Sequence, residues 1–276
     1  MRRYNSSAPV DNTIRSDYPL DDGVIEAFRR DGHVVVRGLL AREDVEPWRP
    51  VVAGAVDDVA RSRDRQGRID DYSELFVQVT NLWRMSEAAR PLVLARRFAG
   101  VAARLLGTPS VRLYHDQALF KPPGAARTPW HQDRHYWPLD TPLTVTMWLA
   151  LVDVPAIAGP MLFASGSHRT EGLGDLDISP ETDWRLQALV ERGQWSISST
   201  PVAAGDATFH AGGTIHSAGA NASDRTREIL TVIYFADGAR AAVPANENQR
   251  VDAEVFLPGV RPGELAASEL NPVLYP

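Results

Sequence analysis

Four polar residues in the second half of the chain have the types and spacing of a metal and cosubstrate site. His131 and Asp133 form a His-Gln-Asp triplet, and His216 follows 85 residues after His131. A His-x-Asp pair with a distant His is typical of the face that holds non-haem Fe(II) and leaves coordination positions open. Arg227 lies 11 residues after His216, and a guanidinium matches a carboxylate through paired hydrogen bonds. Together they indicate Fe(II) chemistry with O2 and a dicarboxylate cosubstrate, 2-oxoglutarate.

Other residues compete for two of these four places. His210 lies six residues before His216, and Gly212-Gly213 are expected to break the strand between them. Arg225 lies two residues before Arg227, and the two side chains can point to the same side. The sequence therefore leaves open His210 in place of His216 and Arg225 in place of Arg227. A lone His-x-Asp is also more often a surface or hydrogen-bonded pair than a metal site. Three further histidines are expected to be structural or exposed: His33, His115 and His168.

The local pattern around the triplet predicts how the ligands are positioned. We expect His131–Trp137 to form a strand, on which alternate residues face the same side. His131 and Asp133 then project into one cavity, together with His135, and Gln132 points away. A later strand, 214–217, brings His216 beside them if the sheet closes or is sandwiched.

The rest of the chain predicts a mainly β core with helices around it. Helices are expected near 22–30, 42–62, 86–95 and 97–106, and a short helical insertion at 181–193. About eight short strands with turn signals between them indicate a β-sandwich or barrel. We expect an irregular arm over 1–19, a single domain over 20–240, and a coil-rich extension over 241–276 packed on that domain. The strands are expected at 33–37, 111–120, 131–137, 144–152, 160–164, 195–199, 207–210, 214–217 and 228–235.

Composition excludes several classes of protein. The chain has 276 residues, 44% hydrophobic and 23% charged, with a net charge of −6, as expected of a globular protein that binds neither nucleic acid nor membrane. It has no cysteine, which rules out disulfides and thiolate ligands. The N-terminus has no apolar stretch typical of a signal peptide, so a cytoplasmic location is expected. Lys121 is the only lysine, which is typical of a GC-rich bacterial genome.

Several separated motifs, in the same order, resemble the phytanoyl-CoA hydroxylase (phytanoyl-CoA dioxygenase) family of Fe(II)/2-oxoglutarate-dependent oxygenases. They are FRRDGHVVVRGLL, QALFKPP, WHQDRHYWPLD, TMWLALVDV, GPMLFASGSHR and FHAGGTIHSAGANASDRTR, and they span roughly residues 21–240. The resemblance implies a double-stranded β-helix (jelly-roll, cupin-like) core with helices packed outside. It also implies a metal at the open mouth of the jelly roll.

The resemblance also assigns roles by position. The expected iron ligands are His131, Asp133 and His216. The expected cosubstrate residues are Arg227, for the distal carboxylate of 2-oxoglutarate, and Gln117 and Trp148. One position departs from the family: Ala218 stands where many members have Ser or Thr, and the adjacent Ser217 is expected to face the other way.

The same reading leads to expectations about the substrate. The four residues that directly follow Asp133 are expected to line the substrate pocket: Arg134, His135, Tyr136 and Trp137. The region 63–90, with Tyr72, Phe76 and Trp83, can form a lid. We expect a small organic substrate, with hydroxylation of an unactivated C–H in bacterial secondary metabolism such as antibiotic biosynthesis. Epimerisation, desaturation or cyclisation would use the same residues, whereas Asp133 disfavours halogenation.

Two other classes of function remain open from the sequence. One is a non-redox, metal-dependent jelly-roll isomerase or hydrolase, which would not need Arg227. The other is a jelly-roll binding module with a vestigial site. Neither the substrate nor the choice between monomer and homodimer follows from the residues.

Overall fold

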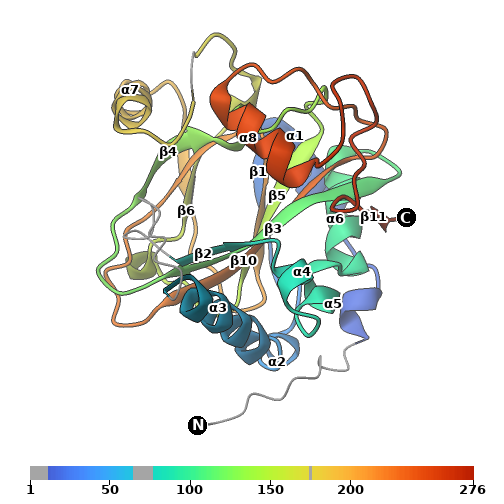
Figure 1. The fold of residues 1–276 in the computed structure, drawn as a ribbon. Helices are drawn as coiled ribbons and strands as arrows, with labels where there is room; N and C mark the ends of the chain where they lie inside the picture. Colours follow the sequence, from blue (N-terminus) through green and yellow to red (C-terminus); the bar gives the residue numbers. More distant parts are fainter. Residues whose placement is uncertain (1–11, 65–76, 174–175) are drawn as a thin grey trace.

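The computed structural model describes residues 12–64, 77–173 and 176–276. Its core consists of two antiparallel sheets with helices outside them (Figure 1). The larger sheet has the order β1-β8-β5-β10-β3-β11, with β2 also paired to β3, and the smaller has the order β4-β9-β6-β7. Neither sheet closes on itself. The mainly β, jelly-roll architecture with peripheral helices that the sequence predicts is therefore confirmed.

The strands of the larger sheet are β1 (His33–Val36), β2 (Val77–Thr80), β3 (Val111–Lys121), β5 (Thr144–Ala150), β8 (Ala207–Ala211), β10 (Arg227–Ala236) and β11 (Val273–Tyr275). Those of the smaller sheet are β4 (Thr128–Gln132), β6 (Met161–Ala164), β7 (Ile197–Ser199) and β9 (Ile215–Ala218). The α-helices are α1 (Asp22–Asp31), α2 (Arg42–Val45), α3 (Arg49–Asp64), α4 (Leu82–Met85), α5 (Arg90–Val93), α6 (Arg96–Leu106), α7 (Pro180–Glu191) and α8 (Glu247–Phe256).

Helix α1 spans Asp22–Asp31, close to the helix expected near 22–30. The Asp21 side chain accepts a hydrogen bond from the Gly23 N–H at 2.7 Å, which satisfies one of the free amides of the first turn. Gly32 ends the helix with a φ of 78°, in the left-handed region that glycine tolerates best. The following strand β1 starts at once, at His33.

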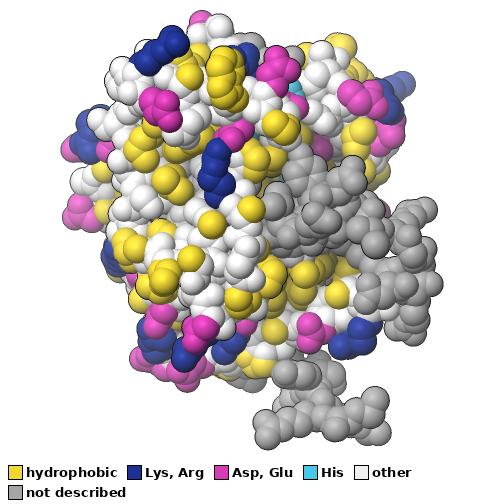
Figure 2. Space-filling view, turned by 90° about the vertical axis from the view of Figure 1, so that its left-hand side faces the viewer, with side chains coloured by type: hydrophobic (Ala, Val, Ile, Leu, Met, Phe, Trp, Pro, Cys, Tyr) yellow, Lys and Arg dark blue, Asp and Glu magenta, His cyan; other side chains and the backbone are white. Residues whose placement is uncertain are grey.

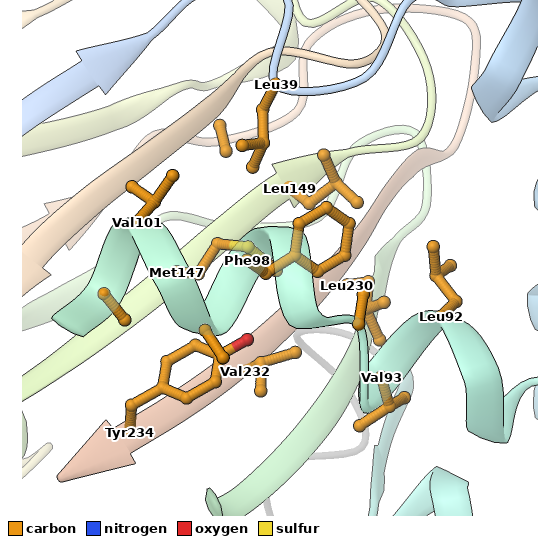
Figure 3. Packing of buried hydrophobic residues seen from close by; sticks show 14 of the residues in the cluster. Leu39, Leu92, Val93, Phe98, Val101, Met147, Leu149, Leu230, Val232 and Tyr234 are labelled. Carbon is orange, nitrogen blue, oxygen red and sulfur yellow. The ribbon is translucent and has the colours of Figure 1, made fainter. Parts of the chain in front are cut away.

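The main hydrophobic core lies between the outer face of the larger sheet and the helices. Helix α6 crosses this face, and Phe98 and Val101 point to the strands (Figure 3). The side chains that meet them come from alternate residues of β5 and β10: Met147, Leu149, Leu230, Val232 and Tyr234. Because side chains alternate along a strand, the residues between these face the interior between the two sheets.

Several sequence-based expectations differ from the structure. The helix expected over 86–95 is shortened to α5, Arg90–Val93. The strand expected over 131–137 ends at Gln132, because the chain turns into a 3-10 helix over Asp133–His135. The single helix expected over 42–62 is broken into α2 and α3, with Pro50 in the first turn of α3. The C-terminal region expected to be coil contains helix α8, which begins where the Asn246 side chain accepts from the Gln249 N–H at 2.8 Å.

Side chains of both charges are interspersed over the face shown in Figure 2, without a patch of one sign among the residues it colours. Within the described ranges, no helix combines the length and the apolar composition that a membrane crossing requires.

Candidate active site

Two histidines face each other across the smaller sheet. His131 on β4 is the direct partner of His216 on β9, and the centroids of their rings lie 4.2 Å apart. Gln132, the next residue of β4, points the opposite way, and its Nε2 donates to the Gly213 carbonyl at 2.6 Å. The sequence prediction for these three side chains therefore holds, although the strand is shorter than expected.

Asp133 reaches the two histidines from a turn and not from a strand. It is the first residue of the 3-10 helix, which is closed by hydrogen bonds from Tyr136 N–H to Asp133 O at 3.0 Å and from Trp137 N–H to Arg134 O at 3.3 Å. Its Oδ1 lies 3.7 Å from His131 Nε2 and 3.5 Å from His216 Nε2. The three ligand atoms lie within 4.8 Å of one another, as a single bound metal ion requires.

Hydrogen bonds fix which atom of each side chain faces the centre of this cluster. His131 Nδ1 donates to Pro129 O at 2.8 Å and His216 Nδ1 donates to Thr214 O at 3.0 Å, because a carbonyl can only accept. Each Nε2 therefore presents a lone pair, which is the state a metal needs. The donor set thus fits a divalent ion such as Fe(II).

His210, the rival to His216, lies behind the carboxylate. Its Nε2 is 3.1 Å from Asp133 Oδ2, which also accepts from the Thr146 hydroxyl at 2.8 Å. Together these contacts leave Oδ1 directed to the two histidines of the cluster. His210 thus contacts the carboxylate oxygen that faces away from His131 and His216. The strand break expected at Gly212-Gly213 is present, because β8 ends at Ala211 and β9 begins at Ile215.

Burial keeps the cluster in a metal-competent charge state. It lowers the pKa of His131 and of His216 to about 4, so both rings are neutral near neutral pH. Burial alone would raise the pKa of Asp133, but the surrounding histidines, His216 first, hold it well below its usual value. Two neutral imidazoles and one carboxylate bind a metal without first losing a proton.

A buried cation lies deeper in the same interior. Arg227, the first residue of β10, is 3% exposed, and its guanidinium carbon lies 5.4 Å from the ring centroid of Trp148. Its Nη1 donates to Gly159 O, while its Nε has no hydrogen-bond partner among the described residues. Burial lowers the pKa of Arg227 to about 10, so it stays charged.

Among the residues that the structure describes, Arg227 forms no ion pair with an Asp or Glu. A buried charge without a counter-ion is costly, and an anionic ligand removes that cost. Arg225 is exposed and lies outside this interior, so it does not compete for the role.

The sequence reasoning missed a second cation beside Arg227. Lys121 is fully buried at the end of β3, directly opposite Arg227 across the β3–β10 pair. Its Nζ donates to Ala126 O at 2.8 Å and to Gly219 O at 3.4 Å. Burial, with a smaller effect of Arg227, lowers the pKa of Lys121 to about 7. The one sequence feature that could have drawn attention to Lys121 is that it is the only lysine of the chain.

One cavity of about 390 Å³ joins these groups. It is lined by the His131, Asp133 and His216 cluster, by Arg227, and by four other residues expected at the site: Gln117, Trp148, Tyr136 and Trp137. Two expected substrate residues do not line it, because the 3-10 turn directs them elsewhere. Arg134 is exposed, and the His135 ring accepts from Leu176 N–H at 3.3 Å and lies 3.1 Å from Asn248 Nδ2.

Ala218 stands where many family members have Ser or Thr, and the structure shows which side chains surround this position. Ala218 lines the cavity, while Ser217 faces away and donates to Thr128 O at 2.6 Å, as expected. Thr128 lies directly opposite Ala218 across the β4–β9 pair and also lines the cavity. A hydroxyl is therefore present beside the position that lacks one.

The far end of the cavity contains residues that the sequence reasoning did not single out for the site. His115, expected to be structural or exposed, lines it together with Asn248, Asp252 and Phe256 of α8. No sequence motif marked α8, because its charged residues look like an ordinary solvated helix. Of the expected lid residues, Trp83 is buried in the main core, and Tyr72 and Phe76 lie outside the described residues.

Comparison with known proteins agrees with this site. The model of the phytanoyl-CoA dioxygenase family matches residues 28–229. The chain therefore belongs to the phytanoyl-CoA dioxygenase family, and the resemblance inferred from its motifs is confirmed.

Individual relatives are distant but cover most of the chain. An ectoine dioxygenase of Streptomyces anulatus is 23% identical over 257 residues, covering 85% of this chain and 86% of the relative. The structure is similar to that of SnoK, a non-heme alpha ketoglutarate dependent carbocyclase from nogalamycin biosynthesis, with a TM-score of 0.75 and 26% identity over 92% of this chain and 96% of SnoK. It is also similar to the epimerase SnoN in complex with Fe3+, alpha ketoglutarate and nogalamycin RO, with a TM-score of 0.66 and 26% identity over 92% of this chain and 98% of SnoN.

Proposed function

We propose that this protein is an Fe(II)- and 2-oxoglutarate-dependent oxygenase whose iron is held by His131, Asp133 and His216. The single observation that carries the proposal is the shared cavity: a preoriented His-Asp-His cluster and a buried guanidinium without a counter-ion line the same space. When bound, iron with 2-oxoglutarate and O2 supplies the oxidising power that breaks an unactivated C–H bond, with succinate and CO2 as coproducts.

The residues of the chain position the reactants and exclude water. Arg227 binds the distal carboxylate of 2-oxoglutarate through paired hydrogen bonds, at the end of the cavity beside Trp148. Gln117 lines the cavity next to this end and contributes a polar contact to the cosubstrate. His210 and Thr146 hold Asp133 in the orientation that directs one oxygen to the metal.

The substrate is a small organic molecule of bacterial secondary metabolism, acted on in the cytoplasm. A cavity of about 390 Å³ suits one small molecule beside the cosubstrate. SnoK and SnoN, both from nogalamycin biosynthesis, support a role in antibiotic biosynthesis. Hydroxylation is the proposed reaction, while the carbocyclase and epimerase names of these neighbours make cyclisation and epimerisation the alternatives.

Anaerobic titration of the protein with Fe(II) and 2-oxoglutarate tests this proposal without the substrate. We expect a weak visible metal-to-ligand charge-transfer band in the wild type and in Arg225→Ala. The band should need far more 2-oxoglutarate in Arg227→Ala, because the distal carboxylate loses its partner. If iron binds to folded protein and no band forms, dependence on 2-oxoglutarate is refuted.

That result would favour the second candidate, a non-redox metal-dependent isomerase or hydrolase. This alternative needs the cluster but not Arg227, so Arg227→Ala would leave its activity intact. The buried guanidinium without an ion-pair partner favours the oxygenase, because a metal hydrolase has no use for a cation there.

A further inference from the structure

The cavity has opposite charges at its two ends. Along β10 the residues that line it are Arg227, Thr231 and Ile233. Arg227 and Ile233 are six residues apart, which corresponds to about 20 Å of strand. The metal cluster lies near Ile233, because Thr146, whose hydroxyl donates to Asp133, pairs with Ile233. Trp148, whose ring lies beside the Arg227 guanidinium, pairs with Thr231.

The end away from Arg227 is formed by β3 and helix α8, which Figure 1 shows near the upper end of the larger sheet. A β-bulge in β3 brings two consecutive residues to α8. Ile233 pairs with His115 and Tyr234 pairs with Leu113, so Tyr114 has no partner on β10. A bulge redirects a side chain and is common next to active sites. Both Tyr114 and His115 contact the Phe256 ring, with centroid distances of 5.6 and 4.0 Å.

The bulge and the end of α8 are fixed to each other by one amide. Asn271 is fully buried, and its Nδ2 lies 3.1 Å from Leu113 O, 3.2 Å from Tyr114 O and 3.1 Å from Phe256 O. The position of α8 over the cavity is therefore built into the fold. It does not depend on surface contacts of the helix.

Asp252 is the charged residue that α8 presents to this cavity. Its Oδ2 accepts from the Tyr114 hydroxyl at 3.2 Å, and no Arg, Lys or His within the described ranges forms an ion pair with it. Burial raises the pKa of Asp252 to about 7; the Tyr114 hydrogen bond opposes this rise, and the Asp133 carboxylate adds to it. A carboxylate placed here is stabilised by a cation, and the residues that the structure describes do not supply one.

The surroundings of Asp252 suit an ammonium group. Tyr136, Trp137 and Phe256 line the cavity on the same side of the metal cluster, and aromatic faces attract cations. Asp177 lines the cavity as well; its Oδ1 accepts from the hydroxyls of Ser179 and Thr182 at 3.0 and 2.7 Å. Asp252, Asp177 and the three aromatic rings thus line the end of the cavity beside α8. Arg227 lines the opposite end.

We propose that Asp252, held by Tyr114 at the bulge of β3, binds a protonated amine of the substrate and so determines which molecule is placed over the metal cluster. The inference rests on the proposed oxygenase function, because it assigns the substrate end of the same cavity. It specifies an amine-bearing small molecule as the substrate class. The amine anchors at Asp252, and the C–H that reacts lies between this anchor and the metal ligands.

A pair of fragments that differ in charge tests the proposal. Benzylammonium and benzyl alcohol have nearly the same size and both fit the cavity. Their dissociation constants are measured by ligand-observed NMR at about pH 8, above the Asp252 pKa and below that of the amine. The protein is the full chain loaded with Zn(II) and 2-oxoglutarate. The Asp133 carboxylate then binds the metal and does not compete with Asp252 for the amine.

We expect the wild type to bind benzylammonium about tenfold more tightly than benzyl alcohol, as a partly buried charge pair requires. Asp252→Asn should bring this ratio to about one, because asparagine keeps the oxygen that accepts from Tyr114 and removes only the charge. The matched control is Glu254→Gln, an exposed acid of the same helix that pairs with Arg250. It should keep the tenfold preference.

Equal binding of the two fragments by the wild type would overturn the proposal, whether or not the variant folds. A preference that survives in a folded Asp252→Asn protein would also overturn it and point to Asp177. The charge-transfer titration separates this outcome from failure of the oxygenase function. Ammonium preference without the band leaves an amine-binding site on a protein of another activity, and the band without ammonium preference leaves an oxygenase with a different substrate.

Discussion

The two faces of the larger sheet are made by the same strands but have different roles: the outer face packs in the main core, and the inner face lines the cavity. On β5, Met147 and Leu149 pack against α6, while Thr146 and Trp148 line the cavity. On β10, Leu230 and Val232 belong to the main core, while Thr231 and Ile233 face the interior. Alternation along a strand thus separates stability from chemistry within single elements. Substitutions on the two faces should therefore have separable effects.

The largest expected effect on the inner face is that of His131→Ala. Losing one of three metal ligands should weaken metal binding by more than about a thousandfold, beyond the 10–100-fold typical of an outer-shell partner. Turnover of 2-oxoglutarate should disappear, while the melting temperature of the metal-free protein changes by only a few degrees. Metal titration by calorimetry and thermal unfolding check the two parts. Retention of full activity would show that the ligand assignment is wrong.

The outer face should respond in the reverse way. Phe98 is fully buried against the sheet (Figure 3), and Phe98→Ala should lower the free energy of unfolding by about 3–5 kcal/mol. Activity per folded molecule should remain close to that of the wild type. Urea unfolding measures the first quantity, and turnover corrected for the folded fraction measures the second. A specific loss of turnover in folded protein would mean that the two faces are coupled.

Arg227 tests whether the inner face separates cosubstrate binding from metal binding. Arg227→Ala should raise the KM for 2-oxoglutarate by about 10–150-fold, because a charged hydrogen bond contributes about 1.5–3 kcal/mol. Metal affinity without 2-oxoglutarate should not change. Arg225→Ala, two residues away and exposed, is the control and should behave as the wild type. Steady-state kinetics in 2-oxoglutarate distinguish the two variants.

The smallest of these effects concerns the residue behind the carboxylate. His210→Phe removes the contact to Asp133 Oδ2 and leaves only the Thr146 hydroxyl to hold it. Metal affinity should fall by about 10–100-fold, with the ligands themselves intact. His168→Phe, a histidine outside the cavity, should leave metal affinity unchanged. Identical affinities for the two variants would remove His210 from the positioning role.

The sequence predicted the metal cluster and Arg227 much better than the end of the cavity beside α8. His131, Asp133, His216 and Arg227 lie in short motifs whose residue types are set by chemistry, and the structure brings them to one cavity. The positions of most strands could also be predicted, because alternation and turn signals are local. Their roles as metal and cosubstrate ligands remain predictions that the variants above address.

The far end depends on packing between segments that are distant in sequence. Asp252 sits over the cavity because Asn271 joins α8 to a bulge in β3. Neither the bulge nor the Asn271 contacts follow from a local pattern. The 3-10 turn at Asp133 was missed for a similar reason. Its geometry depends on the hydrogen bond from Arg134 N–H to Gly212 O at 2.9 Å, which joins residues far apart in the chain.

The close contact of two glycines determines which residues the backbone beside Arg227 can accept. A Cβ on Gly219 would lie 2.7 Å from the Gly159 Cα, so the two backbones touch directly. The carbonyls of the same two residues accept from Arg227. The guanidinium is thus held by two closely packed main-chain segments. A side chain at either glycine would push the two backbones apart and displace the carbonyls that hold Arg227, so this wall accepts glycine alone at both positions.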